Sequence, residues 1–177
     1  REHGHARVDC ELQLGLERLA ALARLAEEAN FSIMHDEVFD SFAYTAAHVP
    51  LISLDPQCRR TLMVNSCSKR FGMTGWRLGW LVLPAARVRD VEKLSQHFTI
   101  CAPSAAQHAA LAAFEPATLQ VLEERRREFE RRRDFLVPAL ERAGLAIPAH
   151  PAGAFYVYTD CARLGGDARR FALEMLE

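Results

Sequence analysis

The stretch that decides the fold is Thr61–Arg77, which reads T-L-M-V-N-S-C-S-K-R-F-G-M-T-G-W-R. Residues 61–64 form a short apolar run, which is typical of a buried strand. The polar residues 66–69 follow directly, and the glycine-containing residues 71–75 indicate a loop. Residues 77–83, R-L-G-W-L-V-L, then predict another buried strand. The order predicted here is strand, polar turn, loop and strand.

Helices and a further strand are expected on both sides of this stretch. Apolar residues at helical spacing predict a helix over residues 11–29, and residues 31–35 predict a strand. After the central stretch, helices are expected over residues 86–97 and 103–114. A long helix is expected to follow Pro116, because proline suits a first helical turn.

The C-terminal part is expected to return to a strand and then to a helix. Residues 154–158, A-F-Y-V-Y, predict a strand. A last helix is expected to begin near Asp167 and to be still running at Glu177. The strands are apolar rather than alternating, and helices separate them, which favours an α/β fold whose sheet is covered on both faces. Ligands of such sheets bind at the carboxyl ends of strands, so the chemistry is expected at Asp36 and at residues 66–69.

Composition and charge exclude several classes of function. The chain has 177 residues with 23 acids and 22 bases, and this net charge of −1 disfavours a strongly basic nucleic-acid binder. No apolar run is long enough for a transmembrane helix. The five cysteines are odd in number and contain no C-x-x-C pair, which favours reduced thiols. A soluble, cytoplasmic protein with no membrane partner is expected.

Two local features have a functional and a structural interpretation. The charged run over residues 123–134 resembles a nucleic-acid patch, but its acids alternate with its arginines. Pairs such as Glu123–Arg127 and Glu128–Arg132 therefore predict a solvated helix face. His3 and His5 are interpreted as part of a polar chain end rather than as metal ligands. The sequence predicts neither nucleic-acid nor metal binding.

Four polar side chains carry the chemistry. Asp36 follows one predicted strand, Ser66 and Lys69 follow the next, and Arg77 opens the third. A lysine amine can form a Schiff base with an aldehyde, and a carboxylate can keep a pyridine nitrogen protonated. A hydroxyl and a guanidinium suit phosphate oxygens. Together these groups suit a phosphorylated pyridine aldehyde. Lys69 and Lys93 are the two lysines of an arginine-rich chain, which draws further attention to Lys69.

Lys69 has two other interpretations. Ser66-x-x-Lys69 also matches a serine acyl-enzyme motif, which requires S-D-N and K-T-G further along the chain. Neither tripeptide occurs in the sequence, so acyl-enzyme chemistry is disfavoured. A solvated surface lysine stays open as the structural alternative.

The run from Ser66 to Trp80, S-C-S-K-R-F-G-M-T-G-W-R-L-G-W, resembles the class I and II aminotransferases, which are fold-type I pyridoxal-phosphate enzymes. D-E-V-F from Asp36 and P-A-G-A-F-Y from Pro151 also match. The resemblance implies a three-layer α/β sandwich with a mostly parallel sheet, plus the start of a small α+β domain. Residues 1–115 would be the C-terminal half of the cofactor-binding large domain. Residues 116–177 would be a linker helix and an incomplete small domain.

The resemblance also implies a role for each site residue. Lys69 would be the catalytic lysine that forms the Schiff base with pyridoxal 5′-phosphate and moves the proton. Asp36 would pair with the pyridine nitrogen, and Ser66 and Arg77 would hold the phosphate. The family has a tyrosine where this chain has Phe39, so one hydrogen bond to the cofactor is lost. The expected result is weaker tuning of the cofactor rather than loss of binding.

The implied function is transfer of an amino group between an amino acid and a keto acid in a homodimer. The family's upstream half and its C-terminal substrate-binding arginine have no match here, so a truncated chain is expected. Arg169 and Arg170 are not assigned that role. The alternatives are another fold-type I reaction, such as a β-lyase or a decarboxylase, and a non-catalytic cofactor-binding fragment or sensor.

Overall fold

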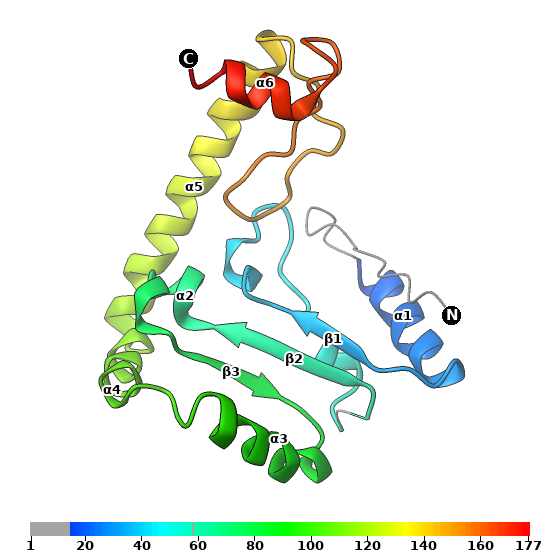
Figure 1. The fold of residues 1–177 in the computed structure, drawn as a ribbon, viewed down its shortest axis with the longest axis vertical. Coiled ribbons are helices and arrows are strands. Elements are labelled where there is room, and N and C mark those ends of the chain that lie inside the picture. Colours follow the sequence, from blue (N-terminus) through cyan, green and yellow to red (C-terminus); the bar gives the residue numbers. More distant parts are fainter. Residues whose placement is uncertain (1–14, 58) are drawn as a thin grey trace.

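The computed structural model describes residues 15–57 and 59–177. His3, His5 and the first residues of the helix expected over residues 11–29 lie outside the described residues. Figure 1 shows a small sheet in one half of the molecule and a long helix that leads away from it to the C-terminal segment. The sheet positions the candidate site, and the long helix connects this site to the rest of the chain.

The three strands of the described residues bring their functional ends together. Strands β1 (Ile33–Asp36), β2 (Thr61–Ser66) and β3 (Gly79–Val82) lie in the order β1-β2-β3. β1 is parallel to β2, with Asp36 opposite Val64. β2 is antiparallel to β3, with Ser66 opposite Gly79. The carboxyl ends of β1 and β2 therefore lie at the same edge as the beginning of β3.

The sheet of the described residues is mixed, whereas a mostly parallel sheet was expected. Residues 67–78 connect β2 to β3 and hold only the four-residue helix α2 (Cys67–Arg70) and the 3₁₀ turn η3 (Thr74–Trp76). A parallel connection usually needs a crossover of a dozen or more residues with a full helix. This connection holds no full helix, and it returns the chain beside β2 in the opposite direction.

The helices agree with the periodicity of the sequence. α1 spans Leu16–Glu28, α3 spans Ala85–Phe98, α4 spans Ser104–Ala113 and α5 spans Pro116–Arg142. The last helix, α6, spans Ala168–Glu174.

The sequence predicts a last helix that begins near Asp167 and continues to the end of the chain. The structure tests both the start and the end of that prediction. The Asp167 side chain caps the first turn by accepting a hydrogen bond from the backbone N–H of Arg170 at 2.9 Å. The helix ends at Glu174, so the expectation that it continues to Glu177 was wrong.

The strand expected over residues 154–158 was also wrong. This segment is irregular, and isolated bridges join Gly153 to Ala43 and Asp160 to Ala146. Ala154 has a φ of 60°, which lies in the left-handed region that alanine rarely adopts. The backbone N–H of Ala154 donates to the carbonyl oxygen of Phe42 at 2.9 Å. A bend held by a distant loop therefore replaces the local extended conformation.

β1 is less buried than its apolar composition predicts. Its residues alternate between half-buried and exposed, and Met34 is 68 % exposed. β1 is an edge strand of the three-stranded sheet, and the described residues leave the Met34 side uncovered. The better-covered strand is the central one, β2, whose Thr61 and Asn65 are buried.

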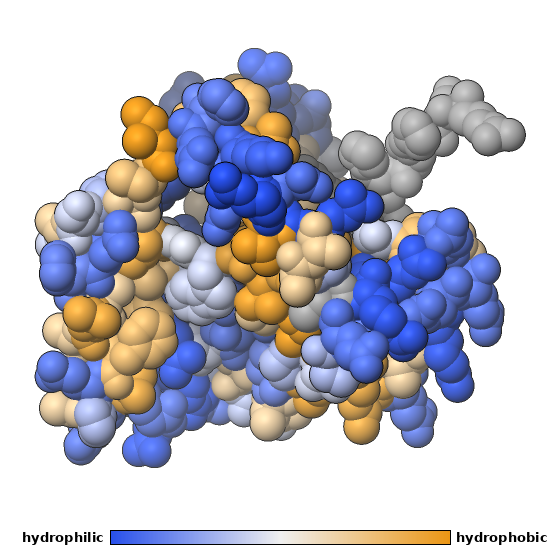
Figure 2. All heavy atoms as spheres, turned by 90° about the horizontal axis from the view of Figure 1, so that it is seen from below, coloured by the Kyte–Doolittle hydropathy of each residue, from blue (hydrophilic) through white to orange (hydrophobic). Residues whose placement is uncertain are grey.

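A compact apolar cluster supports the helix that carries Lys69. Cys67, Phe71 and Met73 pack against Ala110 and Ala113 of α4, so α2 and the loop after it are anchored. Other apolar residues stay exposed, and Figure 2 shows apolar patches among hydrophilic residues on one face of the molecule. No helix of the described residues is both long and apolar enough to cross a membrane.

Candidate active site

The structure gathers the predicted polar residues at one edge of the sheet. Asp36 and Ser66 are the last residues of β1 and β2. Ser66 also caps α2, because its Oγ accepts a hydrogen bond from the backbone N–H of Ser68 at 3.0 Å. The backbone N–H of Cys67 donates to the carbonyl oxygen of Leu78 at 3.0 Å, which brings the approach to β3 beside α2. Lys69 and Arg77 therefore lie on neighbouring segments at this edge.

The two charged groups that flank Lys69 along the edge are exposed. Asp36 Oδ1 accepts one hydrogen bond from the backbone N–H of Val38 at 3.1 Å. Arg77 Nη1 donates to the carbonyl oxygen of Thr74 at 2.9 Å. Neither Asp36 nor Arg77 forms an ion pair with a residue of ranges 15–57 and 59–177. Both charges are therefore open to a ligand.

The hydroxyl group of Ser66 lies within hydrogen-bond distance of two oxygen atoms. Its Oγ lies 2.8 Å from Ser68 Oγ and 3.3 Å from the carbonyl oxygen of Leu78. Two hydroxyl groups therefore lie side by side at the start of α2. Such a pair suits the oxygens of an anion, as the sequence predicts for Ser66.

Lys69 is half-buried beside an aromatic cluster. Its Nζ lies 5.8 Å from the centroid of the Phe155 ring, within the range of a cation–π contact. Phe39 packs edge-on against Phe155 at 5.2 Å and against Tyr156 at 5.7 Å. Phe39 thus borders the surroundings of Lys69 through Phe155. Sequence reasoning included Phe155 in a motif but did not identify it as a neighbour of Lys69.

A hollow of about 660 Å³ opens on one side of Lys69, between α2, the 3₁₀ turn η1 (Asp40–Phe42) and α5. Its walls combine apolar side chains, such as Phe42, Phe129 and Phe155, with charged ones. Arg77 lines a second, smaller hollow of about 420 Å³ with Gly72, Gly75 and Trp76. The edge thus presents Lys69 and Arg77 to two adjacent hollows rather than to one closed pocket.

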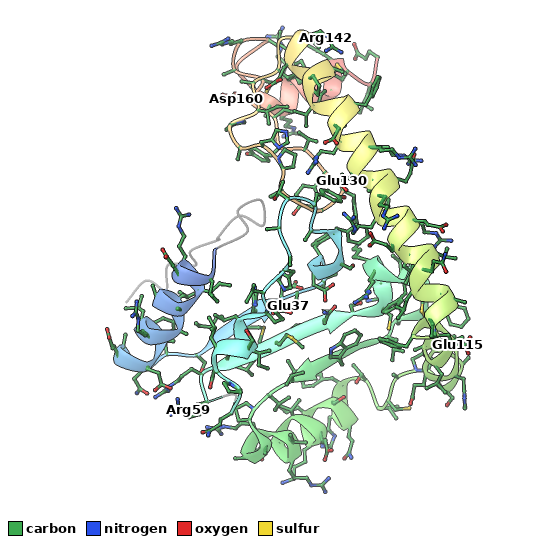
Figure 3. The ribbon with its side chains drawn as sticks, turned by 180° about the vertical axis from the view of Figure 1, so that it is seen from behind. Glu37, Arg59, Glu115, Glu130, Arg142 and Asp160 are labelled. Carbon is green, nitrogen blue, oxygen red and sulfur yellow. The ribbon has the colours of Figure 1, made fainter. Side chains whose placement is uncertain are left out.

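The residue after Asp36 in the chain, Glu37, is a buried acid that sequence reasoning did not identify as part of the site. Glu37 is 3 % exposed, and its carboxylate lies 2.8 Å from His35 Nδ1 and 3.4 Å from His48 Nε2. Figure 3 marks Glu37 at the end of β1. Burial alone would raise the Glu37 pKa, but contacts with the two histidines outweigh it and lower the pKa from 4.5 to about 2. The contact with Glu37, opposed by burial, raises the pKa of His48 above 6.5.

Further polar contacts join this acid to the end of β2. The backbone N–H of Asp40 donates to the carbonyl oxygen of Glu37 at 3.0 Å. Asn65 Nδ2 donates to Asp40 Oδ2 at 3.0 Å, and Asn65 Oδ1 accepts from the backbone N–H of Ser66 at 2.7 Å. The turn after Asp36 is therefore tied to Ser66. No spacing in the sequence pointed to this connection, because Asn65 lies in β2 whereas Glu37 and Asp40 lie in the segment that follows β1.

Comparison with known proteins identifies the family. The α/β fold is shared with fold-type I aminotransferases of known structure. The family profile described as aminotransferase class I and II matches residues 13–177. The chain belongs to the class I and II aminotransferase family.

Two curated relatives illustrate the similarity. The chain is 37 % identical over 161 residues to valine–pyruvate aminotransferase of Mycobacterium tuberculosis, a match that covers 90 % of the chain and 41 % of the relative. It is 36 % identical over 163 residues to aspartate/prephenate aminotransferase of Thermus thermophilus, covering 91 % of the chain and 42 % of the relative. The chain spans about two fifths of the length of these relatives.

Two solved aminotransferase structures illustrate the similarity of fold. A double mutant of Thermus thermophilus aspartate aminotransferase superposes with a TM-score of 0.85 at 35 % identity, covering 90 % of the chain and 42 % of that structure. The aromatic aminotransferase of Pyrococcus horikoshii superposes with a TM-score of 0.86 at 33 % identity, covering 93 % and 44 %. The described fold is therefore that of the matching part of an aminotransferase.

Proposed function

We propose that this chain contributes the lysine-bearing part of a pyridoxal-phosphate-dependent aminotransferase, which transfers an amino group between an amino acid and a keto acid. The observation that carries the proposal is the position of Lys69. It follows the carboxyl end of β2, with an exposed carboxylate at the end of β1 and an exposed guanidinium at the approach to β3. Membership of the aminotransferase family supports the same reaction.

The side chains at the sheet edge fit the cofactor by their chemistry. Lys69 Nζ would bind the aldehyde carbon, because an amine without an ion-pair partner among the described residues is free to do so. Asp36 would accept a hydrogen bond from the pyridinium nitrogen. Ser66 and Arg77 would hold the phosphate. Phe39 would lie at the site, but it has no hydroxyl group and would form no hydrogen bond with the cofactor.

The catalytic work of the chain rests on Lys69. When bound, pyridoxal phosphate supplies an electron sink for negative charge that develops on a substrate carbon. Once the substrate's amine has displaced it from the aldehyde carbon, the Lys69 amine would take the proton from the substrate's α carbon and would deliver it to that aldehyde carbon. Asp36 would keep the ring nitrogen protonated, which maintains the sink.

The finer organisation belongs to the same proposal. Residues 1–115 would be the C-terminal half of the large domain, a three-layer sandwich with a mostly parallel sheet in the complete protein. Residues 116–177 would be the linker helix and part of the small domain. The complete enzyme would be a cytoplasmic homodimer. Two properties support this division: α5 leads away from the sheet (Figure 1), and the chain covers about two fifths of its relatives.

The proposal is tested on the full-length protein by its visible absorption with pyridoxal phosphate. A visible band that is present in the wild type and absent in Lys69→Ala is expected. An unchanged band in Lys69→Ala would contradict the assignment of Lys69. Keto-acid formation from an amino donor then distinguishes an aminotransferase from a non-catalytic sensor. Release of ammonia or carbon dioxide would indicate a lyase or a decarboxylase instead.

A further inference from the structure

The ring that covers Lys69 belongs to a bent segment, residues 151–155. Phe155 follows Ala154, which is buried and has a φ of 60°. A left-handed conformation is unfavourable for alanine and persists only where surrounding contacts enforce it. The position of Phe155 over Lys69 therefore depends on whatever holds this bend.

The backbone of the bend is held by the loop that follows η1. The backbone N–H of Ala154 donates to the carbonyl oxygen of Phe42, and that of Tyr44 donates to the carbonyl oxygen of Ala152, both at 2.9 Å. The approach is close, since a Cβ added to Gly153 would lie 2.6 Å from the Phe42 carbonyl oxygen. Residues 42–44 therefore pack directly against the bend and hold its backbone in place through these hydrogen bonds.

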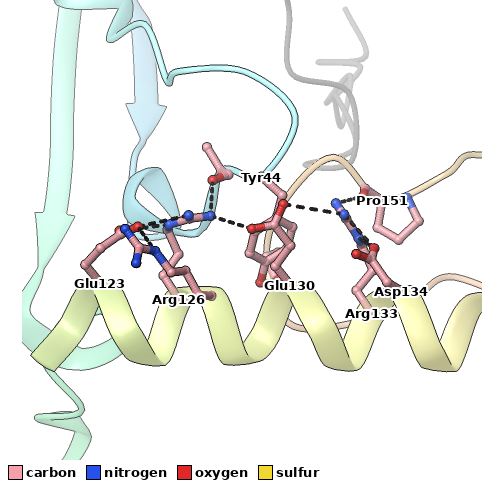
Figure 4. A network of polar contacts seen from close by, with 10 residues as sticks. Tyr44, Glu123, Arg126, Glu130, Arg133, Asp134 and Pro151 are labelled. Atoms are coloured by element: carbon pink, nitrogen blue, oxygen red, sulfur yellow. Dashed lines mark hydrogen bonds and ion pairs between the residues drawn. The ribbon is translucent and has the colours of Figure 1, made fainter.

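Side chains of Tyr44 and α5 secure the same bend. The Tyr44 hydroxyl donates to the carbonyl oxygen of Ala154, the residue with positive φ. Arg133 Nη1 donates to the carbonyl oxygen of Pro151 at 3.1 Å. The Arg133 guanidinium also lies 4.8 Å from the centroid of the Tyr44 ring. Figure 4 shows the contact of Arg133 with Pro151 on one face of α5.

Arg126 completes the attachment about two turns earlier in α5. Its Nη1 donates to the carbonyl oxygen of Ala43 at 3.2 Å. Ion pairs of 2.9 Å with Glu123 and 3.1 Å with Glu130 orient the guanidinium and neutralise its charge. Burial raises the pKa of Tyr44, although the two arginines oppose this effect, so its hydroxyl stays protonated and remains a donor.

We propose that Tyr44 and Arg133 are positioning residues for Lys69, which hold the 151–155 bend so that the Phe155 ring covers one side of the amine. This inference rests on the proposed function for its significance, because Lys69 is the reactive group there. The ring limits the directions from which a reagent or water reaches Nζ. α5 thereby acts on the site through a segment more than 80 residues away in sequence from Lys69.

The test uses the reactivity of Lys69 in the full-length protein without added cofactor. The protein is treated with a trace of acetic anhydride, and peptide mass spectrometry measures acetylation of Lys69 relative to that of Lys93. Lys93 lies exposed on α3 and serves as the internal reference. Tyr44→Phe and Arg133→Ala are each expected to raise this ratio about two- to fivefold, the range that corresponds to the loss of one exposed cation–π contact.

Matched variants separate positioning from general loosening of the fold. Arg131→Ala removes the same charge from a nearby position of α5, but Arg131 is exposed and pairs with Glu128, so its ratio is expected to be unchanged. Phe155→Leu is expected to raise the ratio, whereas the conservative Phe155→Tyr keeps it at the wild-type value. Tyr44→Phe added to Phe155→Leu is expected to cause no further rise, because both changes act through one ring.

Several results would overturn the inference. These are an unchanged ratio in Tyr44→Phe, an equal rise in Arg131→Ala, or additive effects of Tyr44→Phe and Phe155→Leu. Tyr44→Phe removes a single oxygen, so it serves as the decisive variant if Arg133→Ala does not fold. The labelling needs no cofactor, so it can succeed even if the proposed function fails. Protection of Lys69 by added pyridoxal phosphate tests that function separately.

Discussion

Lys69 differs from the other cations of this chain in its surroundings. The arginines of α5 are mostly bound in ion pairs, such as Arg132 with Glu128 at 2.9 Å. Lys69 instead contacts an aromatic ring and lies in a hollow next to the sheet edge. An amine in this position is accessible to an aldehyde, whereas a guanidinium cannot form the same bond. The identity of this one residue is therefore the basis of the proposed chemistry.

Phe39 is the position at which the resemblance predicts a tyrosine. It packs edge-on against Phe155 and Tyr156, so its ring is held without a hydroxyl. Phe39→Tyr is expected to tighten pyridoxal-phosphate binding about two- to tenfold, because one added hydrogen bond contributes about 0.5–1.5 kcal/mol. Equilibrium dialysis measures the change. Phe39→Leu serves as control for altered packing, and equal affinities of Phe39→Tyr and wild type would contradict the expectation.

At the scale of elements, the end of β1 is held by the cluster of His35, Glu37 and His48. The carboxylate of Glu37 is buried and faces both imidazoles, and Asp40 is the further acid near His48. Glu37 has a pKa of about 2 in the fold and 4.5 as a free group, so its stabilising effect is complete above pH 4.5 and is lost as the pH falls toward 2. His48 has a raised pKa, so its effect is complete below pH 6.5 and is lost as the pH rises through the folded value.

Glu37→Gln is therefore expected to destabilise the protein most between pH 4.5 and 6.5, where both contributions are complete. The expected loss is about 2 kcal/mol, the magnitude of hydrogen bonds to a charged group. Urea unfolding at several pH values measures it. Glu124→Gln, at an exposed position of α5, is the matched control and should change little. A pH-independent loss in Glu37→Gln would show that the cluster does not titrate as described.

The elements also show how far the sequence predicts this fold. The helices of α3, α4 and α5 follow from local periodicity, and the pairs Glu123–Arg127 and Glu128–Arg132 are confirmed at 3.1 Å and 2.9 Å. Residues 154–158 were misjudged as a strand because their conformation is set by Phe42 and Tyr44, which are distant in sequence. Local pattern predicts elements whose own hydrogen bonds hold them, and it fails where a distant loop supplies those bonds.

The candidate site was likewise predicted from the sequence only in part. Its position at the ends of β1 and β2 was predicted, because strand order and polar strand ends are visible in the sequence. The neighbours of that site were not predicted, because Phe155 beside Lys69 and His48 beside Glu37 come from loops, whose contacts do not follow from local pattern. The roles of Asp36, Ser66, Arg77 and Phe39 toward a cofactor stay predictions.

At the scale of the whole molecule, the described chain leaves large apolar side chains in solvent. Phe98, the last residue of α3, is 83 % exposed, and Ile100, two residues further along the chain, is 78 % exposed. Exposed apolar surface favours association. The 177-residue chain on its own is therefore expected to self-associate.

Phe98→Lys combined with Ile100→Lys is expected to reduce that association. Lysine suits the end of a helix, where positive charge is favourable, so the fold itself should tolerate the change. Size-exclusion chromatography with light scattering measures the mass of the chain in solution. Gln96→Lys adds a charge on the same exposed helix without removing apolar surface, and it should leave the mass unchanged. An undiminished mass in the double variant would show that another surface drives association.

The central claim is that Lys69 is the residue that binds an aldehyde cofactor. Reduction with borohydride after incubation of the full-length protein with pyridoxal phosphate converts the carbon–nitrogen link into a stable bond, and peptide mass spectrometry locates it. The predicted result is one pyridoxyl-phosphate mass on the peptide that carries Lys69 and none on the peptide that carries Lys93. Label on Lys93 at the same level, or no label on Lys69, would contradict the account.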